Sequence, residues 1–441
     1  MNRIPLGSAV TLAACAALVA AALTVSGLAG AGAPTAAGDW PQWRGPNRDA
    51  LAAATGLKKS WEGGAPKLLW QAGGIGLGFS SLSIVGDRMY TMGDIGPDQF
   101  VFALNRGDGK ILWKTRVGPQ WDDEYPGPRG TPTVDGDRVY ALGSEGDLVC
   151  LDAASGAVRW KKNMDKDYGG RVMTVWKWAE SPLVDGDRLV FTPGGPWAAM
   201  VAVDKMTGKN IWALEQMPSL GEKGRDGAGY SSIVISNGGG VKQYVQLMGR
   251  GLVSVRASDG KFLWSYNRIA NNVANIPTPI VSGDLIFTST GYQTGAALLG
   301  LAKDGDGVKA TEAYFLDPKS FQNHHGGMVL KDGHIYAGHG SNRGFPICVE
   351  MATGKVVWGG DIRNAGTGSA AVLYADGNLY FRYQNGVMML IEATPSGYQE
   401  KGSFQIPQPE KQYPSWSHPV VLDGKLYLRE QDKLYVYDVR G

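Results

Sequence analysis

Cysteine is scarce in this chain, and other features that would point to a particular class of protein are missing too. Only three cysteines occur among 441 residues, which excludes a disulfide-rich scaffold. Neither sign of charge is in excess, because 43 Lys and Arg face 41 Asp and Glu and leave a formal net charge of +2. Without a basic surplus, the composition indicates no nucleic-acid partner. Histidine pairs at the spacing of a zinc-binding helix are also absent from the sequence.

The first 37 residues have the pattern of an export signal. Arg3 supplies a short positive region, and an alanine-rich apolar run follows from Ala9 to about Ala29. This predicts a signal peptide over residues 1–37 and a periplasmic or extracellular mature protein, with no membrane span after cleavage. Two alternatives stay open. The run is long enough for an uncleaved membrane anchor, and Leu12-Ala13-Ala14-Cys15 resembles a lipoprotein cleavage box.

Glycine is the residue in excess, with 64 copies, roughly twice the usual share. Much of it lies in one repeated motif. Val134-Asp135-Gly136-Asp137-Arg138 returns as Val184-Asp185-Gly186-Asp187-Arg188, and weaker copies place the central glycines at 86, 136, 186, 238, 283, 333, 377 and 424. The mean step of about 48 residues, flanked by alternating apolar and polar residues, is typical of propeller blades and of no helical repeat.

A second signature follows each Asp-Gly turn. The stretch 203–212 ends in Gly208-Lys209-Asn210-Ile211-Trp212, and matching stretches end in Trp113, Trp160, Trp264 and Trp358. Two units lack the tryptophan and have Tyr314 and Tyr398 nearby instead. Glycine supplies the positive φ that tight hairpin turns require. Each unit is therefore predicted to contain four strands, A to D, with the tryptophan on strand D.

The last unit ends after strand C, and a lone D-type strand, Lys67-Leu68-Leu69-Trp70, precedes the first full unit. We therefore predict an all-β, eight-bladed β-propeller of four-stranded antiparallel blades over residues 61–441, closed by an N-terminal strand that completes the last blade. Residues 38–60 form a lead-in that either plugs the ring or lies along its side. Cys150 and Cys348 fall in opposite blades, beyond disulfide reach, and are expected to be buried small hydrophobes.

The Gly-Lys-x-x-Trp repeat resembles that of the pyrroloquinoline quinone (PQQ) repeat family over roughly residues 60–441, and 39–46 resembles the lead-in of secreted bacterial members. That family contains PQQ-dependent alcohol dehydrogenases and non-catalytic members such as the outer-membrane assembly propeller. The tryptophan is a packing device and says little about activity. The sequence has no adjacent Cys-Cys pair and no Cys-x-x-Cys-His, so a quinone-stacking disulfide and a covalent haem are not expected.

The predicted topology also locates a functional face. Asp-Gly and Gly-Lys turns fall on one face, so the D-to-A and B-to-C loops meet at the opposite channel mouth. The candidate binding residues on these loops are Phe79, Arg129, Glu180, Tyr230, Asn275, His324, His325, Thr367 and Trp416, with Arg250, Tyr292, His339, Asn342, Arg343, Arg382 and His418. Their many cations predict an anionic or hydroxyl-rich ligand, such as a small molecule or a glycan. The alternative is that the arginines only staple neighbouring loops.

The resemblance implies particular roles for some of these residues. By blade order, Glu180 and Asn275 match the positions that hold Ca²⁺ beside PQQ in the dehydrogenases. The position before blade six, where the dehydrogenases have an aspartate that acts as base, is instead occupied by His324 and His325, either of which is a candidate base. Arg343 is a candidate for stabilising the reduced quinone. Alternatively, Glu180 pairs with Arg129, and the two histidines satisfy loop carbonyls.

Three functions follow from these features. The first is a divergent PQQ-dependent alcohol dehydrogenase, with PQQ and Ca²⁺ but no haem. The second is a propeller that binds its ligand at the mouth without chemistry. The third is a non-catalytic scaffold that grips an envelope protein. The mouth residues favour the first two over the third, and whether the protein is an enzyme stays open.

Overall fold

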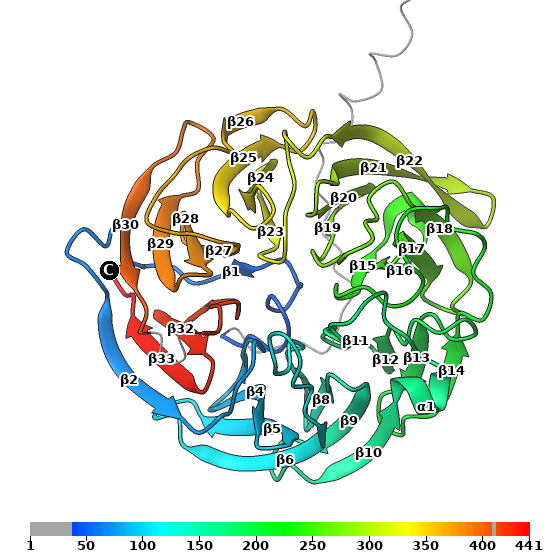
Figure 1. Cartoon of the computed structure of the whole chain (residues 1–441), viewed down its shortest axis with the longest axis horizontal. Coiled ribbons are helices and arrows are strands. Elements are labelled where there is room, and N and C mark those ends of the chain that lie inside the picture. Colours follow the sequence, from blue (N-terminus) through cyan, green and yellow to red (C-terminus); the bar gives the residue numbers. More distant parts are fainter. Residues whose placement is uncertain (1–37, 408–411) are drawn as a thin grey trace, which may run out of the picture.

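The computed structural model describes residues 38–407 and 412–441, so the predicted signal peptide lies outside the described residues. Eight small sheets surround a central axis, as Figure 1 shows. One short helix, α1 (Met164–Tyr168), and one 3₁₀ turn, η1 (Gly238–Gly240), are the helical elements of this part of the chain. The predicted all-β, eight-bladed propeller is therefore confirmed.

Seven blades follow one another along the chain, each with four antiparallel strands ordered from the channel outward, and blade seven gains a fifth strand because β1 (Leu51–Ala52) pairs parallel with its innermost strand. They are β3 (Ser83–Val85), β4 (Arg88–Ile95), β5 (Asp98–Asn105) and β6 (Ile111–Pro119) in blade one; β7 (Thr133–Asp135), β8 (Arg138–Leu142), β9 (Asp147–Asp152) and β10 (Val158–Asn163) in blade two; β11 (Leu183–Asp185), β12 (Arg188–Phe191), β13 (Val201–Asp204) and β14 (Asn210–Ala213) in blade three; β15 (Val234–Ser236), β16 (Gln243–Met248), β17 (Gly251–Arg256) and β18 (Phe262–Tyr266) in blade four; β19 (Ile280–Ser282), β20 (Leu285–Thr290), β21 (Gly295–Asp304) and β22 (Gly307–Leu316) in blade five; β23 (Met328–Lys331), β24 (His334–His339), β25 (Phe345–Glu350) and β26 (Val356–Gly359) in blade six; and β27 (Ala370–Ala375), β28 (Asn378–Tyr383), β29 (Val387–Glu392) and β30 (Glu400–Gln405) in blade seven.

Blade eight is assembled from both ends of the fold. Its inner strands are β31 (Val420–Leu422), β32 (Lys425–Glu430) and β33 (Lys433–Asp438), and its outer strand is β2 (Lys67–Gly73). β2 pairs antiparallel with β33, with Trp70 opposite Val436. The predicted closure of the ring by an N-terminal strand is confirmed. It removes an open edge that would otherwise expose unpaired backbone groups.

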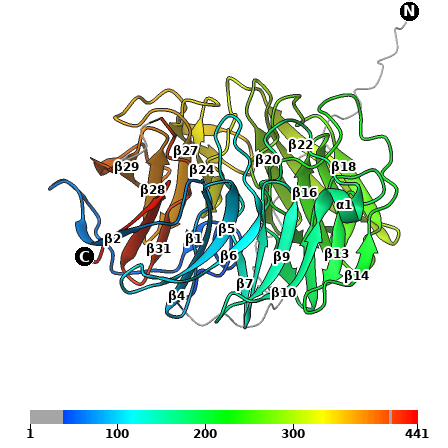
Figure 2. The same ribbon diagram turned by 60° about the horizontal axis from the view of Figure 1, so that its bottom comes forward.

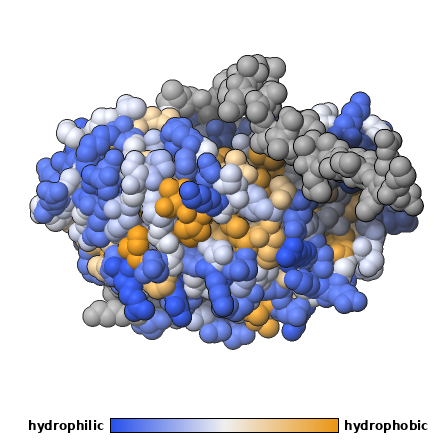
Figure 3. All heavy atoms as spheres, turned by 90° about the horizontal axis from the view of Figure 1, so that it is seen from above, coloured by the Kyte–Doolittle hydropathy of each residue, from blue (hydrophilic) through white to orange (hydrophobic). Residues whose placement is uncertain are grey.

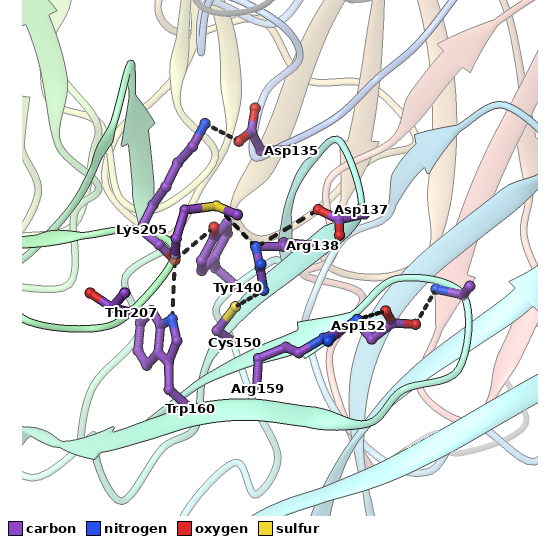
Figure 4. A network of polar contacts seen from close by, with 12 residues as sticks. Asp135, Asp137, Arg138, Tyr140, Cys150, Asp152, Arg159, Trp160, Lys205 and Thr207 are labelled. Carbon is purple, nitrogen blue, oxygen red and sulfur yellow. Dashed lines mark hydrogen bonds and ion pairs between the residues drawn. The ribbon is translucent and has the colours of Figure 1, made fainter.

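The repeated tryptophan joins each blade to the next. In Figure 4, Trp160 of blade two donates a hydrogen bond from Nε1 to the carbonyl of Lys205, in the C–D turn of blade three, at 3.0 Å. Tyr140 donates to the same carbonyl at 3.0 Å. The turn glycine makes room for the ring, because a Cβ on Gly208 would lie 3.0 Å from Trp160. The indole therefore recognises the next blade's turn through a hydrogen bond and through close packing.

Of the two units without a tryptophan, blade five keeps this arrangement, whereas the Tyr398 hydroxyl of blade seven bonds to Glu400 of its own blade at 3.0 Å. In blade five, Tyr314 donates from its hydroxyl to the Met351 carbonyl of blade six at 2.7 Å, and a Cβ on Gly354 would lie 2.9 Å from its ring.

Two tryptophans lack the bond to the next blade. Nε1 of Trp70 in blade eight has no hydrogen-bond partner among the described residues, and Trp264 of blade four donates from Nε1 to Gln243 of its own blade at 2.7 Å. The blade five hairpin is longer there, and nothing lies within 4 Å of a Cβ on Gly305.

The lead-in runs through the ring, which settles the choice between a plug and a lateral course. Figure 1 shows the blue segment and β1 (Leu51–Ala52) in the centre of the ring. Within residues 40–58, hydrogen bonds reach every blade. The partners in blades one to eight are, in order, Ile84, Val134, Pro182, Ile233, Thr278, Met328, Tyr374 and Val439. We call residues 40–58 the threading segment.

Loops and surface complete the description. The side view in Figure 2 shows the strands running between two faces that carry the turns and loops. The part of the rim in Figure 3 is mainly hydrophilic, with separate hydrophobic groups among the polar ones. Cys150 and Cys348 are fully buried and not disulfide-bonded, as predicted. Within residues 38–407 and 412–441, no helix has both the length and the apolar character needed to cross a membrane.

Candidate functional site

A cavity of about 430 Å³ lies at the channel mouth. Its wall combines residues that precede an A strand, such as Arg129 and Trp416, with residues of B-to-C loops, such as Tyr292 and Asn342. The prediction that these two sets of loops meet on one face is therefore confirmed. Of the predicted residues, the cavity brings together Phe79, Arg129, Tyr230, Tyr292, His324, His325, Asn342, Trp416 and His418.

Aromatic rings form much of the wall. Trp416 is central to it, with ring centroids of His325 and Tyr125 each 4.7 Å away and that of Phe79 at 5.0 Å. Across the cavity, Trp176 and Tyr230 meet edge to face at 5.8 Å. Aromatic walls of this kind bind planar or apolar ligand surfaces.

Two arginines line the cavity without forming an ion pair in the described part of the chain. Arg129 donates from Nη2 to the Tyr125 carbonyl at 2.8 Å, and its guanidinium lies 4.7 Å from the Trp121 ring centroid. Burial lowers the pKa of Arg129 to about 10, so it stays charged at neutral pH. The predicted loop-stapling role therefore applies to Arg129, and the residue still presents a positive charge to the cavity.

The threading segment forms the floor of the cavity. Trp43 donates from its indole to Thr278 Oγ1 at 3.3 Å and packs on His418 at 4.4 Å between ring centroids. Arg44, beside it, lines this cavity and also a second one of about 490 Å³ toward the Asp-Gly face. The threading segment thus lies between two separate cavities, one on each side of the ring. Sequence reasoning placed Trp43 and Arg44 in a family lead-in and missed them as site residues.

The histidines at the cavity are held neutral by burial. Burial lowers the pKa of His324 to about 4 and that of His418 to about 3, and it lowers the pKa of His325 well below its usual value. His324 Nε2 lies 2.8 Å from the Tyr292 hydroxyl, and its Nδ1 lies 2.6 Å from Ser369 Oγ. His325 differs, because its buried Nε2 has no hydrogen-bond partner among the described residues.

The chain of hydrogen bonds through His324 determines which atom donates in each bond. Ser369 donates its hydroxyl hydrogen to Asn342 Oδ1 at 3.1 Å. The neutral His324 must then donate from Nδ1 to Ser369 Oγ and accept from Tyr292 at Nε2. The Tyr292 oxygen is left with a lone pair for a ligand donor. Both nitrogens of His324 are occupied, so His325 is the better placed of the two candidate bases.

Glu180 and Asn275 do not line the cavity, although their chain neighbours Ala179, Ser181, Ala274 and Ile276 do. Glu180 Oε2 accepts from the Thr192 amide at 2.8 Å. Asn275 donates to the carbonyls of Met248 and Gly249, and its Oδ1 accepts from the Asn271 amide at 3.1 Å. Both side chains therefore turn into the blades.

These positions do not fit a calcium ion held beside a ligand in the cavity. The described part of the chain also gathers no group of three His, Cys, Asp or Glu side chains suited to a metal ion. The cation that acts on the Glu180 carboxylate is Arg48, not Arg129 as in the predicted pair. Burial outweighs that attraction and raises the pKa of Glu180 to about 8.

Three predicted arginines lie outside the cavity wall. Arg250 forms an ion pair with Asp226, and Arg343 is exposed, with its guanidinium 5.9 Å from the Phe345 ring centroid. Arg382 is fully buried in an ion pair with Glu430 at 2.6 Å. Arg382 also donates to the Ser417 carbonyl at 2.5 Å, so it positions the loop that carries Trp416. Thr367 and His339, also singled out in the sequence, are not in the wall.

Comparison with known families identifies the kind of propeller. A family model described as outer membrane protein assembly factor BamB matches residues 97–360, more than half of the chain. The chain belongs to this family. The BamB-type match confirms the predicted resemblance to PQQ-repeat propellers. It extends from blade one to blade six and leaves out the threading segment, which forms the cavity floor.

Relatives of this BamB-type chain include enzymes and assembly factors. The dehydrogenase subunit of alcohol dehydrogenase (quinone) from Acetobacter aceti is 26% identical over 296 residues, 62% of this chain and 37% of the relative. BamB from Burkholderia pseudomallei is 28% identical over 127 residues, 28% of this chain and 30% of the relative. Among solved structures, quinohemoprotein alcohol dehydrogenase from Comamonas testosteroni has a TM-score of 0.63 at 12% identity, over 91% of this chain and 81% of that one.

This chain therefore covers about a third of the length of the curated relatives named above, 37% of one and 30% of the other. Likeness to the solved structure concerns the fold alone, since its sequence identity is 12%. The relatives include both a quinone-dependent dehydrogenase subunit and an assembly factor, so similarity alone does not choose between these functions. The choice depends on the cavity and its residues.

Proposed function

We propose that this exported propeller binds a planar, anionic small molecule in the mouth cavity. The observation that carries the proposal is the combination of aromatic walls with two arginines, Arg44 and Arg129, that form no ion pair within the described residues. The carboxylates of Asp49 and Asp94 attract these two cations only from beyond ion-pair distance. A buried cation is costly without a partner, and a ligand anion would supply that partner. Stacking on Trp416 would add contact area for a planar ring.

PQQ is the first candidate ligand. It is a flat ring system with carboxylates, which suits a cavity with aromatic walls and unpaired guanidinium groups. A relative named alcohol dehydrogenase (quinone) supports this choice. Arg44 and Arg129 would hold the carboxylates, and the Tyr292 oxygen would accept a ligand donor. When bound, PQQ supplies a redox-active quinone. Because Glu180 and Asn275 face away from the cavity, the proposed binding is independent of calcium.

The residues that face this ligand favour binding over fast chemistry. His325 is placed to accept a proton from a bound hydroxyl, because its Nε2 is free of partners in the described residues. Burial keeps its pKa well below the usual value, however, which makes it a weak base at neutral pH. Arg343, the predicted partner of a reduced quinone, lies outside the wall. Dehydrogenase activity is therefore the secondary part of the proposal.

Calorimetric titration of residues 38–441 with PQQ, with calcium and with a chelator, tests the proposal. We expect one binding site with the same dissociation constant in both conditions. Affinity that requires calcium would contradict the calcium-independent site and restore the predicted roles of Glu180 and Asn275. Absence of binding in both conditions would overturn PQQ as the ligand.

A protein-binding scaffold is the second candidate. It is favoured by the BamB family model and by two apolar side chains exposed on the mouth face. Trp197, between β12 and β13, is 61% exposed, and Val175, before β11, is 60% exposed. Exposed aromatic and aliphatic residues are common anchors in protein interfaces. An envelope protein is the partner class expected for an exported chain of this family.

A further inference from the structure

Arg44 is a buried charge at the floor of the mouth cavity that forms no ion pair within the described residues, although the Asp49 carboxylate attracts it. It comes from the threading segment, is 4% exposed, and donates from Nη2 to the carbonyls of Asp49 and Met328 and from Nε to that of Arg48. Its Nη1 has no hydrogen-bond partner in the described part of the chain. Buried guanidinium nitrogens are rarely left in this state.

The free nitrogen lies on the side of the mouth cavity. A Cβ built on Gly327 would be 2.0 Å from Arg44 Nη1 and 3.5 Å from His418. Gly327 and His418 line the mouth cavity but not the second one. Gly327 has a φ of +74° and no side chain, so its backbone packs closely on this nitrogen, which is itself buried. The guanidinium of Arg44 therefore holds a positive charge and an unsatisfied N–H donor at the floor of the cavity.

Arg48 provides an internal comparison on the same segment. It is also 4% exposed, and its nitrogens donate to Gln42 Oε1 at 2.9 Å, Ile233 O at 3.0 Å and Ser181 O at 3.0 Å. Arg48 lines only the second cavity. Arg44 and Arg48 are thus equally buried, but only Arg44 has a guanidinium nitrogen left to donate to a ligand.

We infer that Arg44 Nη1 is an oxyanion subsite in the floor of the mouth cavity, built to take one carboxylate of the bound ligand. This inference rests on the proposed binding of a planar anion and adds where the anion is held. Arg129, in the loop between blades one and two, would take a second anionic group. The ligand class is therefore an aromatic carboxylic acid, with its ring against Trp416 and Trp43.

The subsite would also couple the ligand to the threading segment. A carboxylate on Arg44 would be bonded to a segment whose hydrogen bonds reach all eight blades. A bound ligand would therefore hold that segment in the channel as well as occupy the mouth. A ligand that binds this folded arrangement and not the unfolded chain would stabilise the folded protein.

Titrations with PQQ and with benzoate, a simple aromatic carboxylate, test the subsite on the full mature chain. Arg44→Gln should weaken both affinities by about ten- to a hundred-fold, the usual effect of losing a charged hydrogen bond. Arg44→Lys, which keeps the charge, should bind more tightly than Arg44→Gln. Arg48→Gln is the matched control and should bind both probes as the wild type does. Thermal unfolding of each variant verifies that it is folded.

The outcomes separate this inference from the proposed function. Wild-type affinity in Arg44→Gln would overturn the subsite and leave the proposed function standing. An equal loss in Arg48→Gln would also overturn the subsite, since the effect would then come from the placement of the threading segment. If the wild type binds neither PQQ nor benzoate, both the function and the subsite fail. If Arg44→Gln does not fold, Arg44→Lys is compared with the wild type: weaker binding of both probes is expected because each offers a carboxylate to this subsite, and unchanged affinity for both would overturn it.

Discussion

Single residues beneath the mouth differ in how well their neighbours compensate their charge. Arg382 and Glu430 are both fully buried, and they neutralise each other at 2.6 Å. Glu180 is also buried, but Arg48 near it spends its hydrogen bonds on carbonyls and on Gln42. Glu180 Oε1 has no partner within the described residues. Glu180 is therefore expected to be protonated over part of the neutral range.

Glu180→Gln should change the pH dependence of stability. Burial raises the pKa of the folded-state carboxyl to about 8, above its ordinary value of 4.5. The folded chain then binds more protons than the unfolded chain between those values, so wild-type stability falls as pH rises, by about 1.4 kcal/mol per pH unit for one group. The variant lacks this loss and should gain on the wild type from pH 5 to pH 9.

Urea unfolding at a series of pH values measures this difference. Exposed Glu124, on the cavity rim, offers Glu124→Gln as the matched control, whose curve should run parallel to that of the wild type. A parallel curve for Glu180→Gln would show that Glu180 is charged in the folded protein at neutral pH. That result would return it to consideration as a metal ligand.

For single residues, the sequence predicted correctly which face of the ring a loop residue lies on. It did not predict where the side chain of that residue points. Glu180 and Asn275 were placed correctly before blades three and five, next to cavity residues. Whether a loop side chain turns into the channel or into its blade depends on local backbone angles and on partners such as the Thr192 amide. These partners are not visible in a single sequence.

At the scale of elements, the C–D turn glycines have two separate requirements. Gly156 has a φ of +74°, and a Cβ there would also lie 2.7 Å from the Trp113 ring. Gly186, in the A–B turn of blade three, has a φ of +61° with nothing within 4 Å of a Cβ. The first glycine is needed for its conformation and for close packing, and the second for its conformation alone.

Substitution by alanine should separate these requirements. Gly186→Ala should lower the free energy of unfolding by about 1–2 kcal/mol, the cost of a left-handed conformation. Gly156→Ala should lose about 1–3 kcal/mol more, because the Trp113 ring must move. Chemical denaturation of the two variants measures the difference. Equal losses would contradict the role of the glycine in docking blade one onto blade two.

Elements were the best predicted level. Each blade arises at a repeat of the glycine-centred A–B turn, which reads Asp-Gly in five of the eight units, because hairpin chemistry is local. Tyr314 was seen as a gap in the tryptophan repeat, and the structure gives it the same kind of bond to the next blade. The altered contact of Trp264 was not foreseen. It depends on Gln243, a residue in a different strand of the same blade.

At the scale of the whole molecule, the threading segment behaves as part of the core. Arg44, Arg48 and Trp40 are each no more than 4% exposed, and the segment has hydrogen-bonded partners in each blade. We expect amide hydrogens of residues 40–52 to exchange as slowly as those of the A strands, measured by mass spectrometry. Fast exchange, at the rate of exposed loop residues, would show that the segment leaves the channel.

This course could not be predicted from the sequence. A segment of mixed polarity with no repeat is compatible with the channel or with the side of the ring. The course of the segment through the channel is fixed by carbonyls at the inner edges of the blades, which accept hydrogen bonds from Arg44 and Arg48. Such acceptors exist only once the ring has formed.

The threading segment has a consequence for the order of assembly. The closing pair, β2 with β33, joins the two ends of the fold, so it cannot form until the last blade is available. A segment enclosed by eight blades must be surrounded as they gather, since a finished ring offers it no open side. Opening the ring and releasing the segment should therefore be a single slow event, and the lifetime of the folded protein would be governed by that barrier. A chain truncated before blade eight would lose the closing strand pair and the Val439 partner of this segment, which should make the segment more open to proteolysis.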